Sequence, residues 1–383
     1  MSVYIQNIEC QVPQTFYLQS SIKERMKGWL KGSRRLNRYI ESLYQHSSIY
    51  KRHSVIDDMD AFFKGLAGGK VSGPTTKVRN DLFASVSRKM CVDLARKVVD
   101  DCHNIDFDEI THLITVSCTG FFNPGPDYEI ISELHLNKSI RRYNIGFMGC
   151  YAAFSAMCLA HTVCLADPGA NVLIVALEFC TVHAQLKQDL DSIRSGAIFA
   201  DGGAAMIVST KPPTPKTKVF ELEHFESALI PDTKDDMAWT IGDRGFEMML
   251  SQNVPKIIGS NIVPVLKPIL DRRGMSISDI DHWAVHPGGK SILDKIESSL
   301  GLENRLQDSR SVLKQYGNMS SATILFVLKR ILQKPSESTD ESILAMAFGP
   351  GLTVEVAFLN KVTAPVTSEE ESEVIAFVKS ASH

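Results

Sequence analysis

The chain has 383 residues, of which 44% are hydrophobic and 22% are charged, as in an ordinary globular protein with a large core. Its formal net charge of -3 gives no electrostatic reason to expect nucleic acid or an anionic membrane as a partner. The eight cysteines contain no C-x-x-C pair, and no basic segment followed by an apolar run opens the sequence, so we expect a cytoplasmic protein without a disulfide framework, a metal or a membrane span.

The first hundred residues combine one predicted strand with two predicted helical regions. Residues Val3–Val12 alternate loosely and predict a strand, and residues 21–50 predict a helical region that carries the densest basic run of the chain. This run is either a solvated helix face or an entrance that attracts a phosphate-bearing substrate. Residues 64–76 predict a loop rich in glycine and lysine, and the apolar spacing of Val78–Cys102 predicts a second helix.

Apolar runs in the next hundred residues predict buried strands. Residues 112–118 and 172–177 are two such runs, and a helix starting near Cys150 is predicted between them. Residues 199–208 turn into a further strand. This order of strand, helix and strand predicts a parallel sheet with crossover helices. Three prolines in residues 211–218 mark the best internal boundary, since they interrupt any regular element.

The same rhythm resumes after this boundary. Strands are predicted at residues 219–229, 282–286, 342–348 and 353–359, and helices at residues 254–273, 291–300 and 320–333. We therefore expect two similar α/β units, at residues 1–215 and 216–361, although their sequences show no clear repeat. Residues 362–383 are expected to form a peripheral tail.

Cys150 stands where one of the predicted helices begins. It follows Gly146-Phe-Met-Gly and precedes a stretch of small and apolar residues that suits a buried helix. At a helix N-terminus the macrodipole and the free backbone N–H groups favour the thiolate, so we expect a lowered thiol pKa and a nucleophilic sulfur. The other interpretation is a small buried hydrophobic residue, which describes most free cysteines.

Two further polar residues lie at a strand end or in a glycine-marked turn. They are His286, in Val285-His-Pro-Gly-Gly289, and Asn318, in Gly317-Asn-Met-Ser-Ser321. Each alone is more often a structural histidine or a capping residue. Together with Cys150, however, they supply a nucleophile, a group that exchanges protons and a second donor for a developing oxyanion. We therefore predict Cys150, His286 and Asn318 as the catalytic residues.

Five motifs occur in an order that resembles a known family. They are Gly146-Phe-Met-Gly-Cys150, Phe199-Ala-Asp-Gly-Gly203, His286-Pro-Gly-Gly289, Gly317-Asn-Met-Ser-Ser321 and Gly349-Pro-Gly-Leu-Thr-Val-Glu355. From roughly Val3 to Leu359 the chain is similar to the type III polyketide synthases, the chalcone synthase-like condensing enzymes. The resemblance implies an α/β thiolase fold, duplicated into five α/β/α/β/α layers, and a homodimer.

The resemblance also implies a reaction. Cys150 would accept an acyl starter from coenzyme A as a thioester, while His286 and Asn318 hold the malonyl thioester carbonyl and stabilise the enolate that decarboxylation forms. The enolate then attacks the enzyme-bound acyl group. Repeated extension gives a poly-β-keto chain that cyclises in the same cavity, without a metal or a redox cofactor.

Departures from the plant pattern bear on the substrate. Phe199 matches one aromatic gatekeeper, Met248 replaces the other, and Trp239 falls near a glycine that shapes the plant cavity. Segments 117–122 and 239–245 are similar to the bacterial branch that makes alkylpyrones and alkylresorcinols, so we expect a medium or long aliphatic starter extended two or three times with malonyl-CoA. The substrate-binding residues implied by the resemblance are Phe199, Met248, Cys118, Thr119, His183, Trp239, Ser320, Gly349 and Pro350.

Coenzyme A contacts carry over less well from the family. The basic positions of the plant pattern align near Tyr39, Ser42 and His46, which leaves delivery of the starter by an acyl carrier protein open as well. The basic residues expected to bind the phosphates instead are Arg34, Arg35, Arg38, Lys51 and Arg52.

Three alternatives remain at this stage. The nearest is a β-ketoacyl carrier-protein synthase, which uses Cys, His and Asn for a single condensation and is fed by an acyl carrier protein. A papain-like hydrolase has the same chain order of Cys, His and Asn but a different local signature. A non-enzymatic partner subunit that binds acyl chains is the third. A biosynthetic thiolase would need a second catalytic cysteine near the C-terminus, whereas the last cysteine here is Cys180.

Overall fold

The computed structural model describes residues 1–63, 73–335, 338 and 340–364. Most of the predicted loop at 64–76 and of the predicted tail at 362–383 therefore lies outside the described residues. Strand β13 (Thr353–Thr363) continues beyond position 361, where the second unit was expected to end.

Both halves repeat one order of elements. The first half contains β1 (Val3–Gln11), α4 (Thr76–Asp100), β4 (His112–Ser117), β5 (Arg141–Gly146), α6 (Ala152–Ala166), β6 (Asn171–Phe179) and β7 (Asp201–Ser209). The second half contains β8 (Lys218–Leu229), α8 (Val254–Arg272), β11 (His282–Val285), α11 (Thr323–Leu332), β12 (Asp340–Gly349) and β13. Each half thus runs strand, helix, strand, helix and then a pair of strands. The first half adds α5 (Pro126–Glu133) and β5, and the second adds α9 (Lys290–Leu300) and α10 (Gln307–Tyr316).

The strands form one mixed sheet. Its order is β11-β12-β13-β8-β1-β7-β6-β4-β5, so the pairing of β1 with β8 joins the two halves. Only β5, β4 and β6, and likewise β11 and β12, are parallel; the other neighbours are antiparallel. The predicted parallel sheet is therefore wrong in the middle, because the last two strands of each half, β6 with β7 and β12 with β13, are antiparallel neighbours.

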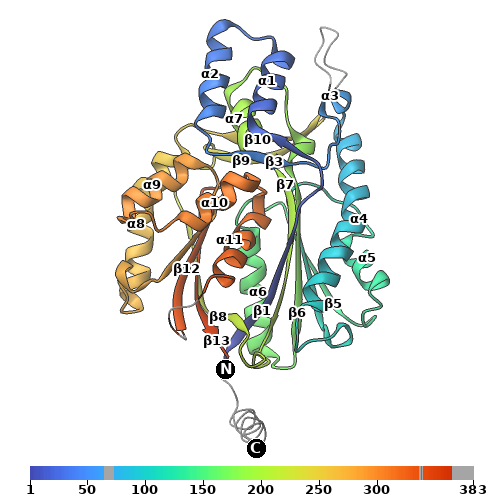
Figure 1. Cartoon of the computed structure of the whole chain (residues 1–383), viewed down its shortest axis with the longest axis vertical. Coiled ribbons are helices and arrows are strands. Elements are labelled where there is room, and N and C mark those ends of the chain that lie inside the picture. The colour runs from blue at the N-terminus through green and yellow to red at the C-terminus, as the bar shows by residue number, and fades with distance from the viewer. Residues whose placement is uncertain (64–72, 336–337, 339, 365–383) are drawn as a thin grey trace, which may run out of the picture.

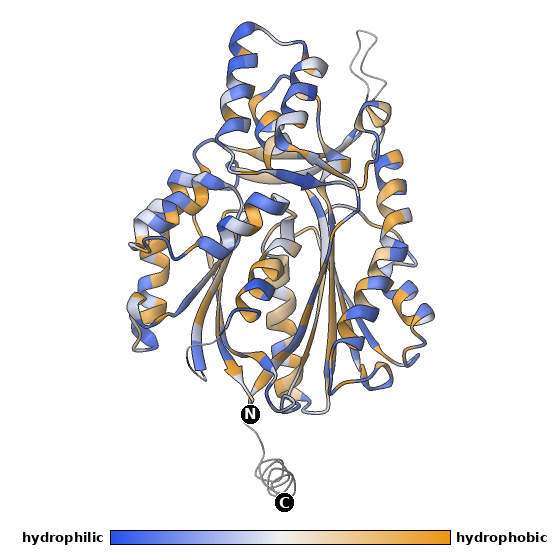
Figure 2. Ribbon diagram, viewed as in Figure 1, coloured by the Kyte–Doolittle hydropathy of each residue, from blue (hydrophilic) through white to orange (hydrophobic). Residues whose placement is uncertain are grey.

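The alternation of side chains along the strands builds five layers. In β6, Val172 and Ile174 pack with the central helices α6 and α11, whereas Leu173 and Val175 pack on the other side with α4. In β12, Ile343 faces the same central helices, and the next residue in the strand faces α8 and α9. Figure 1 shows α6 and α11 between the two halves of the sheet, and Figure 2 shows that α4 and α8 have apolar and hydrophilic faces. The expected layered fold is thus present.

A smaller group of elements covers one end of the layers (Figure 1). It contains β2 (Phe16–Leu18), α1 (Gln19–Leu30), α2 (Arg34–Gln45), β3 (Lys51–His53), α3 (Met59–Phe62), α7 (Leu190–Ile198), β9 (Met237–Gly242) and β10 (Gly245–Leu250). The helical region predicted at 21–50 is present, but as two helices, the second of which ends at Gln45. Lys31 ends α1 in the left-handed conformation, at φ 44°, and the Ser33 hydroxyl caps α2 by accepting from the Leu36 N–H at 3.2 Å.

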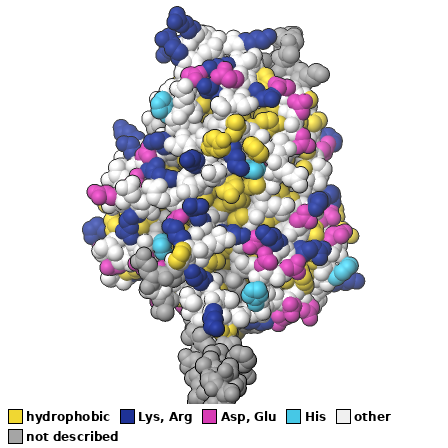
Figure 3. All heavy atoms as spheres, viewed as in Figure 1, with side chains coloured by type: hydrophobic (Ala, Val, Ile, Leu, Met, Phe, Trp, Pro, Cys, Tyr) yellow, Lys and Arg dark blue, Asp and Glu magenta, His cyan; other side chains and the backbone are white. Residues whose placement is uncertain are grey.

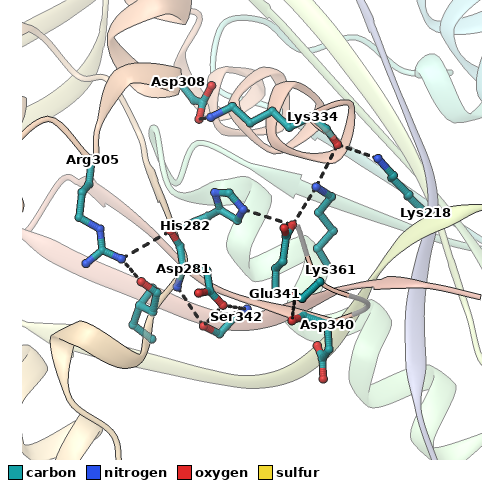
Figure 4. A network of polar contacts seen from close by, with 12 residues as sticks. Lys218, Asp281, His282, Arg305, Asp308, Lys334, Asp340, Glu341, Ser342 and Lys361 are labelled. Carbon is teal, nitrogen blue, oxygen red and sulfur yellow. Dashed lines mark hydrogen bonds and ion pairs between the residues drawn. The ribbon is translucent and has the colours of Figure 1, made fainter. Parts of the chain in front are cut away.

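A buried ion pair anchors the second half at the opposite end. Lys361 Nζ lies 2.9 Å from Glu341 Oε2 and donates to the Lys334 carbonyl at 3.1 Å, while a ring nitrogen of His282 lies 3.3 Å from the same carboxylate (Figure 4). The three strands β11, β12 and β13 are thereby tied together where β12 begins. Removing the Glu341 carboxylate would leave the Lys361 ammonium buried without the counter-ion of this pair.

Candidate active site

Cys150 lies just before the first turn of α6 and is 8% exposed. The residue before it, Gly149, has φ +89°, and a Cβ at that position would lie 2.4 Å from Pro350 Cδ. Likewise, a Cβ on Gly349 would lie 2.4 Å from the Tyr151 ring. The two glycines therefore allow the loop between β12 and β13 to approach the cysteine closely.

Asn318 meets Cys150 from the start of the other central helix. Its backbone N–H donates to the Ile198 carbonyl at 2.9 Å, and its carbonyl accepts from the Ala200 N–H at 2.8 Å. Its side-chain oxygen accepts from the Ser320 N–H at 2.9 Å, and its Nδ2 lies 4.0 Å from the Cys150 sulfur. Because the oxygen has a backbone donor, the amide N–H₂ is left to face the site.

His286 follows β11 and completes the group. Its backbone N–H donates to the Met346 carbonyl at 2.8 Å, which fixes it against β12. The side chain is 1% exposed, and neither ring nitrogen has a hydrogen-bond partner among the described residues. Buried polar atoms of this kind are rarely left without a partner, so this ring is available to a ligand.

Burial dominates the electrostatics of these residues. Loss of hydration raises the pKa of Cys150 to about 12, although hydrogen bonds from Ser320 and Asn318 lower it in part. Loss of hydration also lowers the pKa of His286 to about 3. The lowered thiol pKa expected from the helix N-terminus is therefore wrong for the unliganded site, because dehydration of the sulfur outweighs the favourable dipole. Thiol and imidazole both rest in their neutral forms.

The three residues line one cavity of about 630 Å³. Seven of the nine predicted substrate-binding residues line the same cavity: Cys118, Thr119, Phe199, Trp239, Met248, Ser320 and Pro350. Gly349 instead supports the wall by packing against Tyr151. The lining is mainly apolar, with few polar groups at the reacting end, as in small-molecule sites generally.

A second apolar cavity of about 630 Å³ adjoins the first and shares Cys180, Phe199, Trp239 and Met248 with it. Its remaining wall comes from α1, α3, α7 and the short helix η3 (Cys180–His183). The ninth predicted residue, His183, lies here. One ring nitrogen bonds the Thr119 carbonyl at 2.6 Å, the other accepts from the Phe246 N–H at 3.1 Å, and burial lowers the pKa of this histidine to about 3.

Sequence reasoning missed a buried carboxylate beside the cysteine. Glu178 accepts hydrogen bonds from the Cys118 N–H at 3.0 Å and from the Thr119 hydroxyl at 2.9 Å, and Ser321 donates to it from the other half. Burial raises the pKa of Glu178. A lone charged residue directly after the apolar run at residues 172–177 of β6 was the available signal. Cys180, which lines both cavities, was missed as well.

A third, open hollow of about 1100 Å³ leads outward from the first cavity, with which it shares Ile198, Leu250, Gly288 and Ile292. Tyr39, Ser42 and His46 of α2 line it, and Arg34, Arg35 and Arg38 are exposed on the same helix. Basic side chains gather at the tip of the molecule that α1 and α2 form (Figure 3).

The other two basic residues predicted to bind coenzyme A lie elsewhere. Lys51 extends over the Phe16 ring, with its Nζ 4.9 Å from the centroid. Arg52 is 4% exposed and is bonded inside the protein, so it cannot reach a phosphate at the entrance. The prediction for Arg52 is therefore wrong.

Other classes of site are not supported by the part of the chain that the structure describes. Within it, no helix is both long and apolar enough to cross a membrane. The described residues also contain no group of three or more His, Cys, Asp or Glu side chains placed to hold a metal ion.

Comparisons with known proteins agree with this architecture. The family model of the N-terminal domain of chalcone and stilbene synthases matches residues 6–212, and that of the C-terminal domain matches residues 221–363. The alpha-pyrone synthesis polyketide synthase-like protein Pks18 of Mycobacterium tuberculosis is 34% identical over 321 residues, which are 82% of this chain and 80% of Pks18. Probable polyketide synthase 1 of Dictyostelium discoideum is 30% identical over 94% of this chain, which matches 11% of that much longer protein.

Solved structures show the same fold. The C-terminal type III polyketide synthase domain of Steely1, a type I/III hybrid from Dictyostelium, superimposes with a TM-score of 0.86 at 29% identity and covers 94% of this chain and 100% of that domain. PKS-I of the brown alga Ectocarpus siliculosus gives 0.84 at 28% identity, over 94% of this chain and 99% of that one. Fold and matches together define a polyketide synthase, an acyltransferase with a thiolase-like fold. The chain belongs to the chalcone and stilbene synthase family, the type III polyketide synthases.

Proposed function

We propose that this enzyme condenses malonyl-CoA decarboxylatively onto an acyl group held by Cys150. One observation carries the proposal: a thiol, an amide N–H₂ and an imidazole that has no hydrogen-bond partner among the described residues converge in one mainly apolar cavity. His286 takes the thiol proton, the sulfur attacks the acyl thioester carbonyl, and the departing coenzyme A thiolate receives the proton. This proton transfer starts from a neutral thiol and a neutral imidazole, which are the forms that burial favours for both side chains.

The extension step uses hydrogen-bond donors from His286 and Asn318. When the malonyl thioester loses CO₂, the electron pair of the broken C–C bond forms an enolate, whose oxygen accepts hydrogen bonds from His286 and Asn318. The enolate carbon then attacks the acyl carbonyl on Cys150 and releases the sulfur. All bond changes balance with these residues and the two thioesters, so the scheme assigns no role to a metal or a redox cofactor.

The second cavity supports an aliphatic starter. Its apolar wall adjoins the reacting end through Phe199, Trp239 and Met248, so a fatty acyl tail can extend into it while the thioester carbon stays at Cys150. Pks18, a relative at 34% identity, is described as an alpha-pyrone synthesis enzyme. We infer a medium or long acyl starter, two or three extensions and cyclisation to an alkylpyrone or an alkylresorcinol.

The open hollow is the proposed route for the thioester arm. Arg35 and Arg38 lie one turn before Tyr39 and Ser42 on α2, so they can meet phosphates at the entrance. Coenzyme A is the proposed carrier of starter and extender. An acyl carrier protein is the alternative, since the matched Steely1 domain belongs to a type I/III hybrid.

A product screen by mass spectrometry tests the proposal. Purified protein, malonyl-CoA and acyl-CoA starters from acetyl to palmitoyl, with one aromatic starter, are compared for wild type and Cys150→Ala. Alkyl-tailed pyrones or resorcinols that vanish in the variant are expected. A strict preference for the aromatic starter would refute the aliphatic assignment. Failure of all coenzyme A starters, with acylation of Cys150 from a carrier protein, would favour a single-condensation, carrier-fed synthase.

A further inference from the structure

Arg52 lies in the interior, against the wall of the second cavity. Its Nε donates to Gln19 Oε1 at 2.9 Å, and one terminal nitrogen donates to the Phe199 carbonyl at 2.6 Å. The other terminal nitrogen has no hydrogen-bond partner among the described residues. Burying a guanidinium costs free energy because the charge is dehydrated. A buried arginine with fixed contacts therefore suggests a role other than stabilising the fold.

The Phe199 carbonyl belongs to the segment that holds Asn318. Phe199 and Asn318 form an isolated parallel bridge, with the two backbone hydrogen bonds of 2.9 and 2.8 Å on either side of it. The side chain of Arg52 also packs under Gly317. A Cβ on Gly317, whose φ is +76°, would lie 3.0 Å from Arg52 Cγ and equally close to the Ile198 carbonyl. Arg52 therefore contacts both strands of the bridge.

Neighbouring groups fix Arg52 from the other side. Gln19 donates to the Ala197 carbonyl at 2.7 Å, so the residue that accepts from Arg52 is itself bound to the end of α7. Asp201 accepts from the Val55 N–H at 2.8 Å and from the Thr181 N–H at 2.7 Å, and its charge acts on Arg52. Arg52 thus joins α1, β3 and the two backbone segments that enter the site.

We propose that Arg52 is a positioning residue that sets the Asn318 amide and the Phe199 ring through the bridge between them. The inference rests on the proposed role of Asn318 in decarboxylation. A misplacement of about 1 Å at a reacting group can cost on the order of 100-fold in rate. Acyl transfer to Cys150, by contrast, needs the thiol and His286. Asn318 acts on it only through a long contact of 4.0 Å with the sulfur, so acylation should depend less on where the amide points.

The test measures the two half-reactions separately in Arg52→Met. Malonyl-CoA decarboxylation is followed by CO₂ release, and Cys150 acylation from an acyl-CoA by intact-protein mass spectrometry. We expect kcat for decarboxylation to fall by about 10-fold or more with KM within about 3-fold, and the acylation rate to stay within about 3-fold of wild type. A lysine at position 52 can reach only one of the two acceptors, Gln19 Oε1 or the Phe199 carbonyl. Arg52→Lys should therefore restore part of kcat for decarboxylation.

Arg79→Met is the matched control. Arg79 is also buried and donates to backbone carbonyls, at 2.9 Å to Pro74 and 3.1 Å to Ala184, but it does not contact the bridge. The Arg79→Met variant should have a lowered melting temperature, as Arg52→Met should. The ratio of its decarboxylation rate to its acylation rate should stay at the wild-type value. If Arg52→Met does not fold, Gln19→Met, which removes one acceptor, should show the same split to a smaller degree.

Two results would overturn the inference: unchanged decarboxylation in Arg52→Met, or an equal fall of both half-reactions there and in Arg79→Met. A wild-type enzyme that does not decarboxylate malonyl-CoA would instead refute the proposed function. The two failures are therefore distinguishable.

Discussion

Dehydration, more than any single charged neighbour, sets the state of the ionisable residues around the cavities. It lowers the pKa of His286 and His183 to about 3 and raises that of Cys150 to about 12. Neutral side chains pack and hydrogen-bond without a counter-ion, which suits the proposed stabilisation of an enolate away from water. The same dehydration makes the folded protein sensitive to acid.

Replacing His183 with Asn tests that sensitivity. The pKa of this histidine is lowered from 6.5 to about 3, so below pH 6.5 the unfolded chain takes up a proton that the folded chain refuses, and stability falls until about pH 3. At pH 5 the loss is about 2 kcal/mol. The free energy of unfolding of wild type should therefore drop by about 2 kcal/mol more than that of His183→Asn between pH 7.5 and pH 5.

Urea unfolding at both pH values gives this difference. The exposed His103→Asn serves as control and should follow wild type. Parallel pH profiles for wild type and His183→Asn would show that burial does not hold this ring neutral.

At the scale of elements, the group of short helices that covers one end of the layers encloses the second cavity, which is the proposed site of the acyl tail. Helices α1 and α7 face each other across the second cavity, where a Cβ on Gly196 would lie 3.6 Å from Met26 Cε. A side chain longer than a methyl group at position 196 must therefore extend into the cavity or displace its wall.

Gly196→Leu should exclude long acyl starters while short ones are still accepted. The added carbons occupy space that a fatty acyl tail would fill, and each excluded methylene is worth about 0.8 kcal/mol. We expect kcat/KM for dodecanoyl-CoA to fall by about 10-fold or more while acetyl-CoA stays within about 3-fold. Gly28→Leu, on the exposed side of α1 with no atom within 4 Å of its Cβ, is the control. Equal losses for both starters would contradict an acyl site in this cavity.

At the scale of the whole molecule, one edge of the large sheet is open. Among the described residues, strand β5 pairs with β4 alone, and its Arg141–Asn144 segment is exposed, including Tyr143 at 40%. Exposed edges with aromatic side chains favour pairing with another strand. We propose that β5 pairs with its copy in a homodimer, the assembly that the family resemblance implies.

Tyr143→Asp places a charge on this edge and should separate the subunits. Light scattering after gel filtration should then give a mass near 42.4 kDa instead of twice that value. Val263→Asp, an equally exposed position on α8, should leave the mass unchanged. A dimer that survives Tyr143→Asp would place the interface elsewhere.

Much of the site was accessible to sequence reasoning because its parts are local. Glycine-marked turns and strand ends identified Cys150, His286 and Asn318, and apolar runs located most of the long strands and helices. The two strands β9 and β10 were not predicted, because their side chains alternate too weakly between the two faces. The break between α1 and α2 was missed although Gly32 and Ser33 are a stop and an N-cap signal, since the left-handed residue that ends α1 is a lysine.

The sequence by itself determined the order of elements and the family, and it singled out the three side chains that meet in one cavity, since each rests on neighbouring residues or on motifs. Only the tertiary structure decided what depends on residues far apart in the chain. Dehydration raises the pKa of Cys150, which the sequence led us to expect below its usual value. Arg52, which was expected at the entrance, is buried and donates to the Phe199 carbonyl. Burial and charge depend on everything that packs around a side chain, so local sequence cannot determine them.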